Sequence, residues 1–263
     1  MATRATSSTG TRIVSLAFWL DLRGYGAMLN TAGFDPTCPE ARDAIARLRR
    51  FQEVVAEHSR TRFPTLVIND GAVAYRDIGV RVTDEAWPFI ERCWNLYTAA
   101  MDADRKLGGV GLRGVVAAGL RARGSNRGIL AQNDAITKII NDLADGRITR
   151  EEAISAAAGV RRVSDIVPQL QANFAFSRAY TAEQGARSGK LQGSRFYLES
   201  RVFSDGVPDW MTAGEPIHWQ PKADWLSTLA TTFVEVQAIA PPAINPEKAI
   251  RTGGELLPLL QRA

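Results

Sequence analysis

The sequence predicts an α+β fold in which a mostly antiparallel sheet is flanked by helices. Two apolar stretches flank Asn69-Asp70-Gly71, and Asp-Gly between such stretches is the strongest short-range signal of a β-hairpin. Longer segments with helical periodicity alternate with short apolar runs along the chain. With 263 residues, 45% of them hydrophobic, the chain is long enough to bury a sizeable core. The order of these segments indicates a βαββαβ core.

The first half of the chain supplies that core. Residues 13–20 form a short, mostly apolar run with β-branched and aromatic members, which is typical of a buried strand. An amphipathic helix is predicted over 39–58, the hairpin lies within 62–76, and a second helix runs from about 84 to 107. Another apolar strand, bounded by glycines, covers 110–120. The helix positions predicted to face the core are Ala44, Ile45, Leu48, Phe51, Val54, Val55, Trp87, Ile90, Cys93, Trp94, Tyr97 and Met101.

The second half of the chain is predicted in less detail. A loop is expected at 124–128, followed by two short helices around GRITREEAI, where Thr149 and Glu152 fit a capping box. A helix over 165–184, a basic glycine-rich loop and a strand over 195–203 follow. We then expect a late hairpin at 216–220, a helix at 224–238, and a proline-broken tail that ends in a short helix.

No linker or internal repeat divides the sequence, which indicates one domain over 12–240 with an insertion at about 121–163. We expect residues 1–11 to be a disordered tail rather than an export signal, and 241–263 to be a C-terminal tail. Cys38 and Cys93 belong to no Cys/His cluster, so we expect a reducing cytoplasm and neither disulfides nor a zinc site. No apolar run approaches the roughly 20 residues of a membrane span.

The charge balance bears on possible partners. The 32 basic and 28 acidic residues give a net charge of +4, which suits an anionic ligand such as a nucleotide but not the coating of nucleic acid. A helix–turn–helix could be imagined between 121 and 163. Its second helix, EEAISAAAG, begins with acidic residues and carries few side chains that could read bases. We therefore expect no nucleic-acid partner.

Two aspartates stand at structurally related positions. Asp21 ends the first strand, and Gly24 and Gly26 behind it would let the backbone approach a ligand closely. Each aspartate also has an ordinary alternative, because Asp21 could cap the next helix and Asp70 could be a simple turn residue. The end of a strand and the turn of an adjacent hairpin can lie side by side in an antiparallel sheet. The pair therefore predicts an oxygen-ligand site for Mg²⁺ or Mn²⁺, of the kind that neutralises a triphosphate and activates a hydroxyl.

Motifs in this order resemble those of the class III nucleotidyl cyclases, the family of adenylyl and guanylyl cyclases. The family's first strand carries Phe-x-Asp-[Ile/Leu]-x-Gly-[Phe/Tyr], which resembles the stretch that ends Asp21-Leu22-Arg23-Gly24-Tyr25. Its hairpin carries Gly-Asp-[Gly/Ala], similar to Asn69-Asp70-Gly71, and its next strand resembles VGLRGVVAAG at 110–119. Its catalytic helix carries Asn-x₃-Arg, which resembles Asn173 and Arg178, one residue further apart. The resemblance covers roughly residues 12–203.

The resemblance implies a class III cyclase fold with a palm-like βαββαβ core, and a role for each matching residue. Asp21 and Asp70, with Leu22, would bind two divalent ions, Mn²⁺ or Mg²⁺. The turn formed by Leu22, Arg23, Gly24 and Tyr25 would contact the phosphates of a nucleoside triphosphate through backbone groups.

The catalytic helix has implied roles as well. Asn173 would orient the ribose, and Arg178 would stabilise charge at the α-phosphate while the 3′-hydroxyl attacks and pyrophosphate leaves. In the family this helix comes from the second subunit, which implies a head-to-tail homodimer with two shared sites. A solvated helix face remains the alternative for both residues.

Departures from the family pattern bear on the substrate. Purine cyclases usually place a lysine four residues before the hairpin aspartate, where this chain has Leu66. Asp165 resembles the family's second base-reading residue. The stretches PTLVINDGAVAYRD and NFAFSRAYTAEQG resemble the pyrimidine cyclases of bacterial antiphage defence, the Pycsar systems. We therefore expect a uridylate cyclase that converts UTP to 3′,5′-cyclic UMP, sensed by a separate effector protein, with CTP as the alternative substrate.

Two other functions compete with this prediction. A catalytically silent cyclase-homology domain could serve as a dimerising sensor, but it would have little reason to keep two like charges close together. A diguanylate cyclase needs a Gly-Gly-[Asp/Glu]-Glu-Phe hairpin, which differs from Asn69-Asp70-Gly71.

Overall fold

The computed structural model describes residues 12–79, 86–122, 127–160, 167, 170–185, 191–240 and 246–261. Contacts divide the chain into two compact units: residues 12–121 with 173–263, and residues 122–172. The smaller unit contains most of the segment that the sequence marks as an insertion. Residues 1–11, predicted to be a tail, lie outside the described residues.

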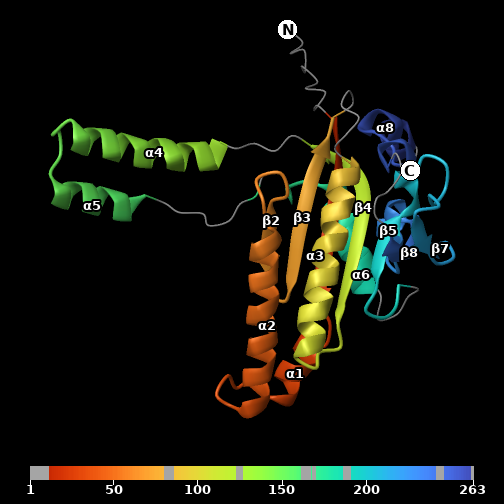
Figure 1. Ribbon diagram of the computed structural model, residues 1–263. Helices are drawn as coiled ribbons and strands as arrows, with labels where there is room; N and C mark the ends of the chain where they lie inside the picture. Colours follow the sequence, from red (N-terminus) through yellow and green to blue (C-terminus); the bar gives the residue numbers. More distant parts are fainter. Residues whose placement is uncertain are drawn as a thin grey trace, which may run out of the picture. The chain divides into compact units, whose positions relative to one another are not determined.

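An eight-stranded sheet forms the framework of the larger unit (Figure 1). Its strands lie in the order β2-β3-β1-β4-β5-β8-β6, and β7 also pairs with β8. β4 and β5 pair in parallel, whereas β1–β3, β2–β3, β5–β8, β6–β8 and β7–β8 pair antiparallel. The predicted α+β class, with a mostly antiparallel sheet and flanking helices, is confirmed. The strands of the predicted core are β1 Arg12–Leu22, β2 Thr65–Ile68, β3 Gly71–Ile78 and β4 Leu112–Ala122.

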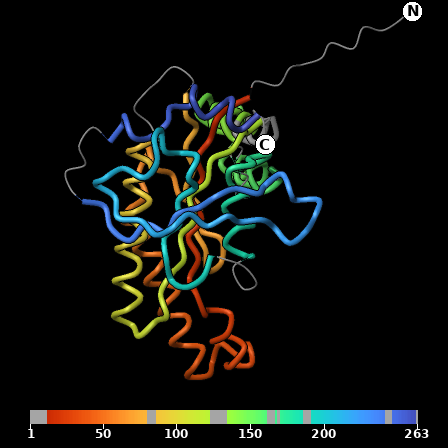
Figure 2. Tube along the Cα trace, turned by 90° about the vertical axis from the view of Figure 1, so that its right-hand side faces the viewer, coloured from red at the N-terminus to blue at the C-terminus, as the bar shows by residue number. Residues whose placement is uncertain are grey.

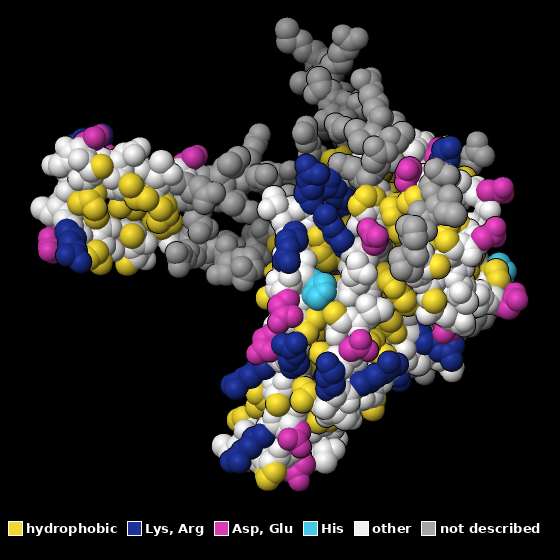
Figure 3. Space-filling model, viewed as in Figure 1, with side chains coloured by type: hydrophobic (Ala, Val, Ile, Leu, Met, Phe, Trp, Pro, Cys, Tyr) yellow, Lys and Arg dark blue, Asp and Glu magenta, His cyan; other side chains and the backbone are white. Residues whose placement is uncertain are grey.

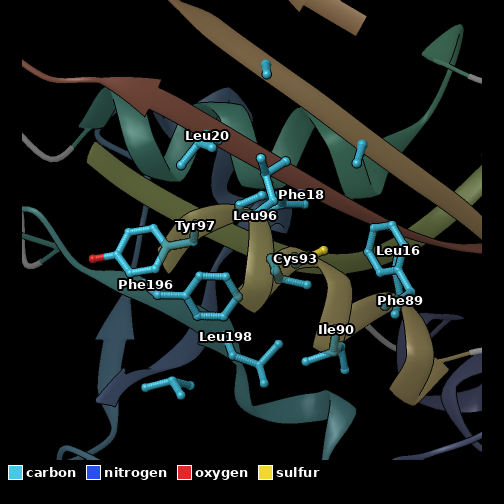
Figure 4. Close-up of a cluster of buried hydrophobic side chains, with 14 of the residues drawn as sticks. Leu16, Phe18, Leu20, Phe89, Ile90, Cys93, Leu96, Tyr97, Phe196 and Leu198 are labelled. Carbon is cyan, nitrogen blue, oxygen red and sulfur yellow. The ribbon is translucent and has the colours of Figure 1, made fainter. Parts of the chain in front are cut away.

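Helices cover the sheet on both faces, and β1 contacts both layers because side chains alternate along a strand. Leu16, Phe18 and Leu20 are buried in the cluster that includes residues of α3 (Ala86–Lys106), as Figure 4 shows. Ser15 and Trp19, on the other face, contact residues of and next to α6 (Phe174–Gln184). All residues from Val14 to Leu20 are therefore buried, which explains the continuous apolar run in the sequence.

Two long helices match the predictions for the first half closely. After the short helix α1 (Tyr25–Thr31), α2 spans Pro39–His58 and packs against α3. The exposed side of this layer carries basic and acidic side chains in alternation, as Figure 3 shows. Between the helices a buried ion pair joins Arg47 Nε to Asp104 Oδ1 at 2.7 Å and Arg47 Nη2 to Asp104 Oδ2 at 2.9 Å. Breaking such a buried pair typically costs about 3–5 kcal/mol, so it fixes α2 against α3.

The C-terminal part of the larger unit extends the sheet. It contains β5 Phe196–Glu199, β6 Met211–Ala213, β7 Ile217–Trp219 and β8 Thr231–Ile239, with 3₁₀ turns at Ser200–Val202 and Asp224–Leu229. The chain ends with α7 (Pro246–Ala249) and α8 (Gly253–Gln261), so the predicted short final helix is confirmed. Figure 2 shows α8, in dark blue, beside the beginning of β1, in red.

Two predicted helices are wrong, one in its type of secondary structure and one in the residue at which it begins. The segment predicted as a helix over 224–238 is a 3₁₀ turn followed by β8. Phe196 and Val236 are paired residues of β5 and β8, so sheet pairing decides the conformation of this β-branched segment. The helix predicted over 165–184 begins only at Phe174, because Ala172 has a left-handed φ of 47° and Asn173 caps the helix.

The smaller unit contains two helices, α4 (Arg127–Ala144) and α5 (Arg150–Gly159). The predicted capping box is confirmed, since Glu152 N donates to Thr149 Oγ1 at 3.2 Å and Thr149 N donates to Glu152 Oε2 at 2.7 Å. α4 is longer than the short helix expected there. Within the described ranges, none of the helices combines the length and the apolar character that crossing a bilayer requires.

Candidate active site

Asp21 and Asp70 lie at the same edge of the sheet, as the sequence predicts. Asp21 is the register partner of Gly71 in the β1–β3 ladder, and the backbone N–H of Leu22 donates to Asp70 O at 2.9 Å. Asn69 adopts a left-handed φ of 54° in the hairpin turn, a conformation that asparagine tolerates better than most residues. The tight turn therefore holds Asp70 next to the end of β1.

Gly71 is required by the neighbouring tryptophan as well as by the turn. A Cβ atom at this position would overlap Trp19 Cζ2, far inside van der Waals contact. The indole thus packs directly against the backbone of the hairpin. Trp19 lies two residues before Asp21, so both side chains are on the same face of β1. This contact aligns the first residues of β3 with the end of β1.

The turn behind Asp21 is held by a network from three other elements. Arg23 N donates to Gly111 O at 3.2 Å, and Arg47 Nη2 donates to Arg23 O at 3.1 Å. Asp104, the partner of Arg47, accepts a hydrogen bond from Gly111 N at 2.8 Å. Gly24 has a φ of 78°, which a side chain would strain. The turn is therefore fixed by α2, α3 and the loop before β4 in a shape set by glycine.

A cavity of about 410 Å³ opens where these parts meet. It contains both aspartates and the whole turn that the sequence singles out. Its lining residues are Asp21, Leu22, Arg23, Gly24, Tyr25, Gly26, Ala27, Asp70, Arg113, Glu183 and Gln184.

The carboxylates in this cavity repel one another. Burial, the charge of Glu183 and the charge of Asp70 together raise the pKa of Asp21 to about 7, against the opposing effect of Arg113. The pKa of Glu183 is also raised, mainly by burial, and burial with the charge of Asp70 raises the pKa of Tyr25. A divalent cation would relieve this repulsion directly.

The two aspartates of the cavity fit Mg²⁺ or Mn²⁺ as a site completed by waters and substrate phosphates. In the described part of the chain, no group of three or more His, Cys, Asp and Glu side chains could hold a metal ion. Mg²⁺ is commonly bound by one or two protein carboxylates together with waters and substrate phosphates. Asp21 and Asp70 would supply those two carboxylates, and Leu22, which also lines the cavity, would add a backbone carbonyl.

α6 runs along β1, with its two ends at opposite ends of that strand. Glu183, in its last turn, lines the same cavity as Asp21, and its charge raises the pKa of that aspartate. Asn173, at the other end, donates from Nδ2 to Ser15 Oγ at 3.2 Å, and its Oδ1 caps the helix by accepting from Phe176 N at 3.0 Å. Ten residues of α-helix span about 15 Å. The structure therefore does not bring Asn173 to the aspartates of its own chain.

Arg178 is likewise an interior residue of its own chain. Its side chain donates from Nε to Leu229 O at 3.1 Å and from Nη1 to Ala118 O, and Nη1 lies 3.9 Å from Glu199 Oε1. Asn173 and Arg178 are 1% and 5% exposed, so neither lies on the solvated helix face considered as the alternative.

The two remaining predicted site residues lie elsewhere. Leu66 is a half-buried residue of the edge strand β2, opposite Val73, and it is not among the residues lining the cavity. Asp165 lies outside the described residues.

Sequence reasoning missed Arg113, Glu183 and Gln184, which line the cavity. Arg113 offered one signal, because it is a single charged residue near the start of an otherwise apolar strand. Glu183 and Gln184 offered none, because only the packing of α6 along β1 brings them to the aspartates.

No protein-family model matches the sequence, and no curated protein sequence matches it either. Solved structures overlay on most of the chain, among them two cyclases. The guanylyl cyclase Cya2 is 14% identical, with a TM-score of 0.48, and the overlay covers 89% of this chain and 96% of that one. The adenylyl cyclase CyaB from P. aeruginosa is 9% identical, with a TM-score of 0.45 and coverage of 89% and 98%.

Proposed function

We propose that this protein is a nucleotidyl cyclase that converts UTP to 3′,5′-cyclic UMP and pyrophosphate. One observation carries the proposal: Asp21 and Asp70 lie in one cavity with the glycine-containing turn that joins β1 to α1. Two carboxylates beside a tight backbone turn suit the binding of a nucleoside triphosphate together with divalent ions.

Each lining residue then has a task that its chemistry allows. Asp21 and Asp70 hold Mn²⁺ or Mg²⁺, and the backbone from Leu22 to Gly24 lies beside the phosphates. Bound divalent ions would supply neutralisation of the triphosphate and acidification of the attacking 3′-hydroxyl. Tyr25, buried at the start of α1, closes the cavity on the side of that helix.

The proposed enzyme is a homodimer, because the resemblance assigns Asn173 and Arg178 to the site of a second subunit. Both side chains are engaged inside their own chain, so this role requires their internal contacts to rearrange when two chains associate. Mixing a chain carrying Asp70→Ala with a chain carrying Arg178→Lys, each inactive alone, should restore part of the activity. Heterodimers that form but stay inactive would refute the shared site.

The choice of base follows from the residues that replace the purine-reading pattern. Leu66 cannot donate a hydrogen bond, and a purine left with an unpaired polar edge loses about 1–3 kcal/mol for each missing bond. That loss corresponds to roughly ten- to hundredfold in affinity. The carboxylate of Asp165 could accept the N3–H of uracil but would repel the bare N3 of cytosine, which favours UTP over CTP.

The deciding experiment is incubation with each of the four nucleoside triphosphates and Mn²⁺, with the products identified by mass. Cyclic UMP in excess over the other products supports the cyclase activity and the choice of UTP. Mostly cyclic CMP would refute only the role of Asp165, whereas mostly cyclic AMP or GMP would refute the pyrimidine substrate. No cyclic product from a dimeric, folded protein would favour a catalytically silent sensor.

The proposed setting rests on the sequence resemblance alone. In a bacterial cytoplasm, cyclic UMP would act as a second messenger of antiphage defence on a separate effector protein. No nucleic-acid or membrane partner is proposed.

A further inference from the structure

Arg113 is a buried cation whose guanidinium group forms part of the cavity that contains Asp21 and Asp70. It projects from β4 and is only 6% exposed. Arg113 Nε donates to Gly193 O at 3.1 Å, and Nη1 donates to Glu183 Oε1 at 2.9 Å. These two contacts hold the plane of the guanidinium from one side.

The other side of the guanidinium is available to a ligand. Among the residues that the structure describes, none accepts a hydrogen bond from Arg113 Nη2. The Nε and Nη1 groups of this buried arginine are hydrogen-bonded, whereas Nη2 can still donate a hydrogen bond to a bound ligand.

A second cation, Arg23, lies near this group, and none of the carboxylates in the described part of the chain forms an ion pair with it. Arg23 also lines the cavity, and its Nη1 donates to the neutral hydroxyl of Ser194 at 2.9 Å. Burial lowers the pKa of Arg113, and the charge of Arg23 adds to this effect against the opposing charge of Glu183. Two guanidinium groups that line one cavity can both donate hydrogen bonds to one anionic ligand.

We propose that Arg113, together with Arg23, binds the polyphosphate chain of the substrate, and that Glu183 is a positioning residue that orients the Arg113 guanidinium toward it. The inference rests on the proposed function for the identity of the ligand. The cavity holds three carboxylates (Asp21, Asp70 and Glu183) and two guanidinium groups, so its own charge does not favour an anion. Polyphosphate binding should therefore depend on a divalent cation at Asp21 and Asp70.

The test is isothermal titration calorimetry of the full chain with the Mn²⁺–tripolyphosphate complex and with Mn²⁺ alone. Arg113→Gln is expected to weaken tripolyphosphate binding tenfold or more without weakening the binding of Mn²⁺ alone, because the removed charge is a cation. Arg121→Gln is the matched control, because Arg121 is a buried arginine of the same strand, paired with Asp77, and is not part of the cavity lining. It should leave tripolyphosphate affinity within twofold of wild type.

Glu183 variants separate positioning from charge. Glu183→Gln keeps an oxygen that can accept from Arg113 Nη1 and should bind tripolyphosphate at least as tightly as wild type. Glu183→Ala removes that acceptor and should weaken binding severalfold, with no comparable effect on Mn²⁺ alone. Equal affinities in the Ala and Gln variants would overturn the positioning role.

Two further outcomes keep the inference distinct from the proposed function. Cyclic product from wild type, with unchanged tripolyphosphate binding by Arg113→Gln, would overturn the role of Arg113 and leave the cyclase proposal intact. Loss of tripolyphosphate binding in Arg113→Gln, without any cyclic product from wild type, would support the anion site and refute the cyclase. If Arg113→Gln does not fold, Arg113→Lys replaces it, because lysine keeps the charge but lacks the two parallel donors of a guanidinium. Wild-type affinity of Arg113→Lys for tripolyphosphate would overturn the inference.

Discussion

Asp21, near the end of β1, and Glu183, in the last turn of α6, line the same cavity. Burial and the charge of Glu183 raise the pKa of Asp21, and burial raises the pKa of Glu183. The protonation of one group therefore depends on the charge of the other. The same arrangement places a residue from the second half of the sequence beside the strongest motif of the first half.

Stability of the metal-free protein should depend on pH through this pair. Because the pKa of Asp21 is raised from 3.8 to about 7, the native chain keeps a proton that the unfolded chain has lost between those pH values. Its contribution to the free energy of unfolding is thus fully present below about pH 4 and is lost as pH rises toward 7.

Asp21→Asn removes this titration and supplies the comparison. Relative to wild type, the variant should gain about 1 kcal/mol or more in unfolding free energy between pH 5 and pH 8, since each pKa unit corresponds to about 1.4 kcal/mol. Urea unfolding in the presence of EDTA measures this. Parallel pH profiles for the two proteins would contradict the raised pKa of Asp21.

Divalent-ion binding should depend on Asp70 as well as on Asp21. Asp70→Asn keeps the shape of the turn residue but removes one of the two carboxylate charges, so we expect the affinity for Mn²⁺ to fall tenfold or more in calorimetry. Asp102→Asn, at a residue with a 70% exposed side chain on α3, is the control and should bind Mn²⁺ as wild type does. Wild-type affinity in Asp70→Asn would remove Asp70 from the site.

The contact between Trp19 and Gly71 predicts a specific pattern of stability losses. Gly71→Ala should lower the free energy of unfolding by about 1–3 kcal/mol, because the added methyl group overlaps the indole. Combining it with Trp19→Leu, which removes the overlapping ring atoms, should cost less than the sum of the two single losses.

A second glycine provides the control for that pattern. At Gly26, in α1, a Cβ atom would have no neighbouring atom within 4 Å, so Gly26→Ala should be neutral or stabilising by up to about 1 kcal/mol. Strictly additive losses at positions 19 and 71 in urea unfolding would show that the indole does not pack on Gly71.

Removing Arg178 should be costly even before any effect on catalysis. Arg178→Ala leaves the carbonyl groups of Leu229 and Ala118 without their donor and reduces the charge compensation of the buried Glu199. The expected loss in unfolding free energy is about 3 kcal/mol or more, measured in urea. Arg178→Lys keeps the charge and should lose less. Equal stability of wild type and Arg178→Ala would mean that these internal contacts contribute little.

The sequence by itself determined the core of the fold and the position of the aspartates. Local periodicity is a sufficient signal for α2 and α3, because each buries one side over five turns or more. The Asp-Gly hairpin signal fixed the register of β2 and β3. The antiparallel pairing of β3 with β1 then brings Asp70 to the end of β1. These features depend on residues that are close in sequence or on one antiparallel pairing.

The tertiary structure alone decided the features that depend on distant partners. β8 is a strand because β5 pairs with it, although its sequence had suggested a helix. Arg113 meets Asp21 because β4 lies next to β1 in the sheet. Glu183 meets Asp21 only because α6 packs along β1, and the same packing buries Asn173 and Arg178 at a distance from that cavity. Helix periodicity states that one face of α6 is buried, but the residue that each position meets is set by the strand beneath it, which lies more than 150 residues earlier in the chain.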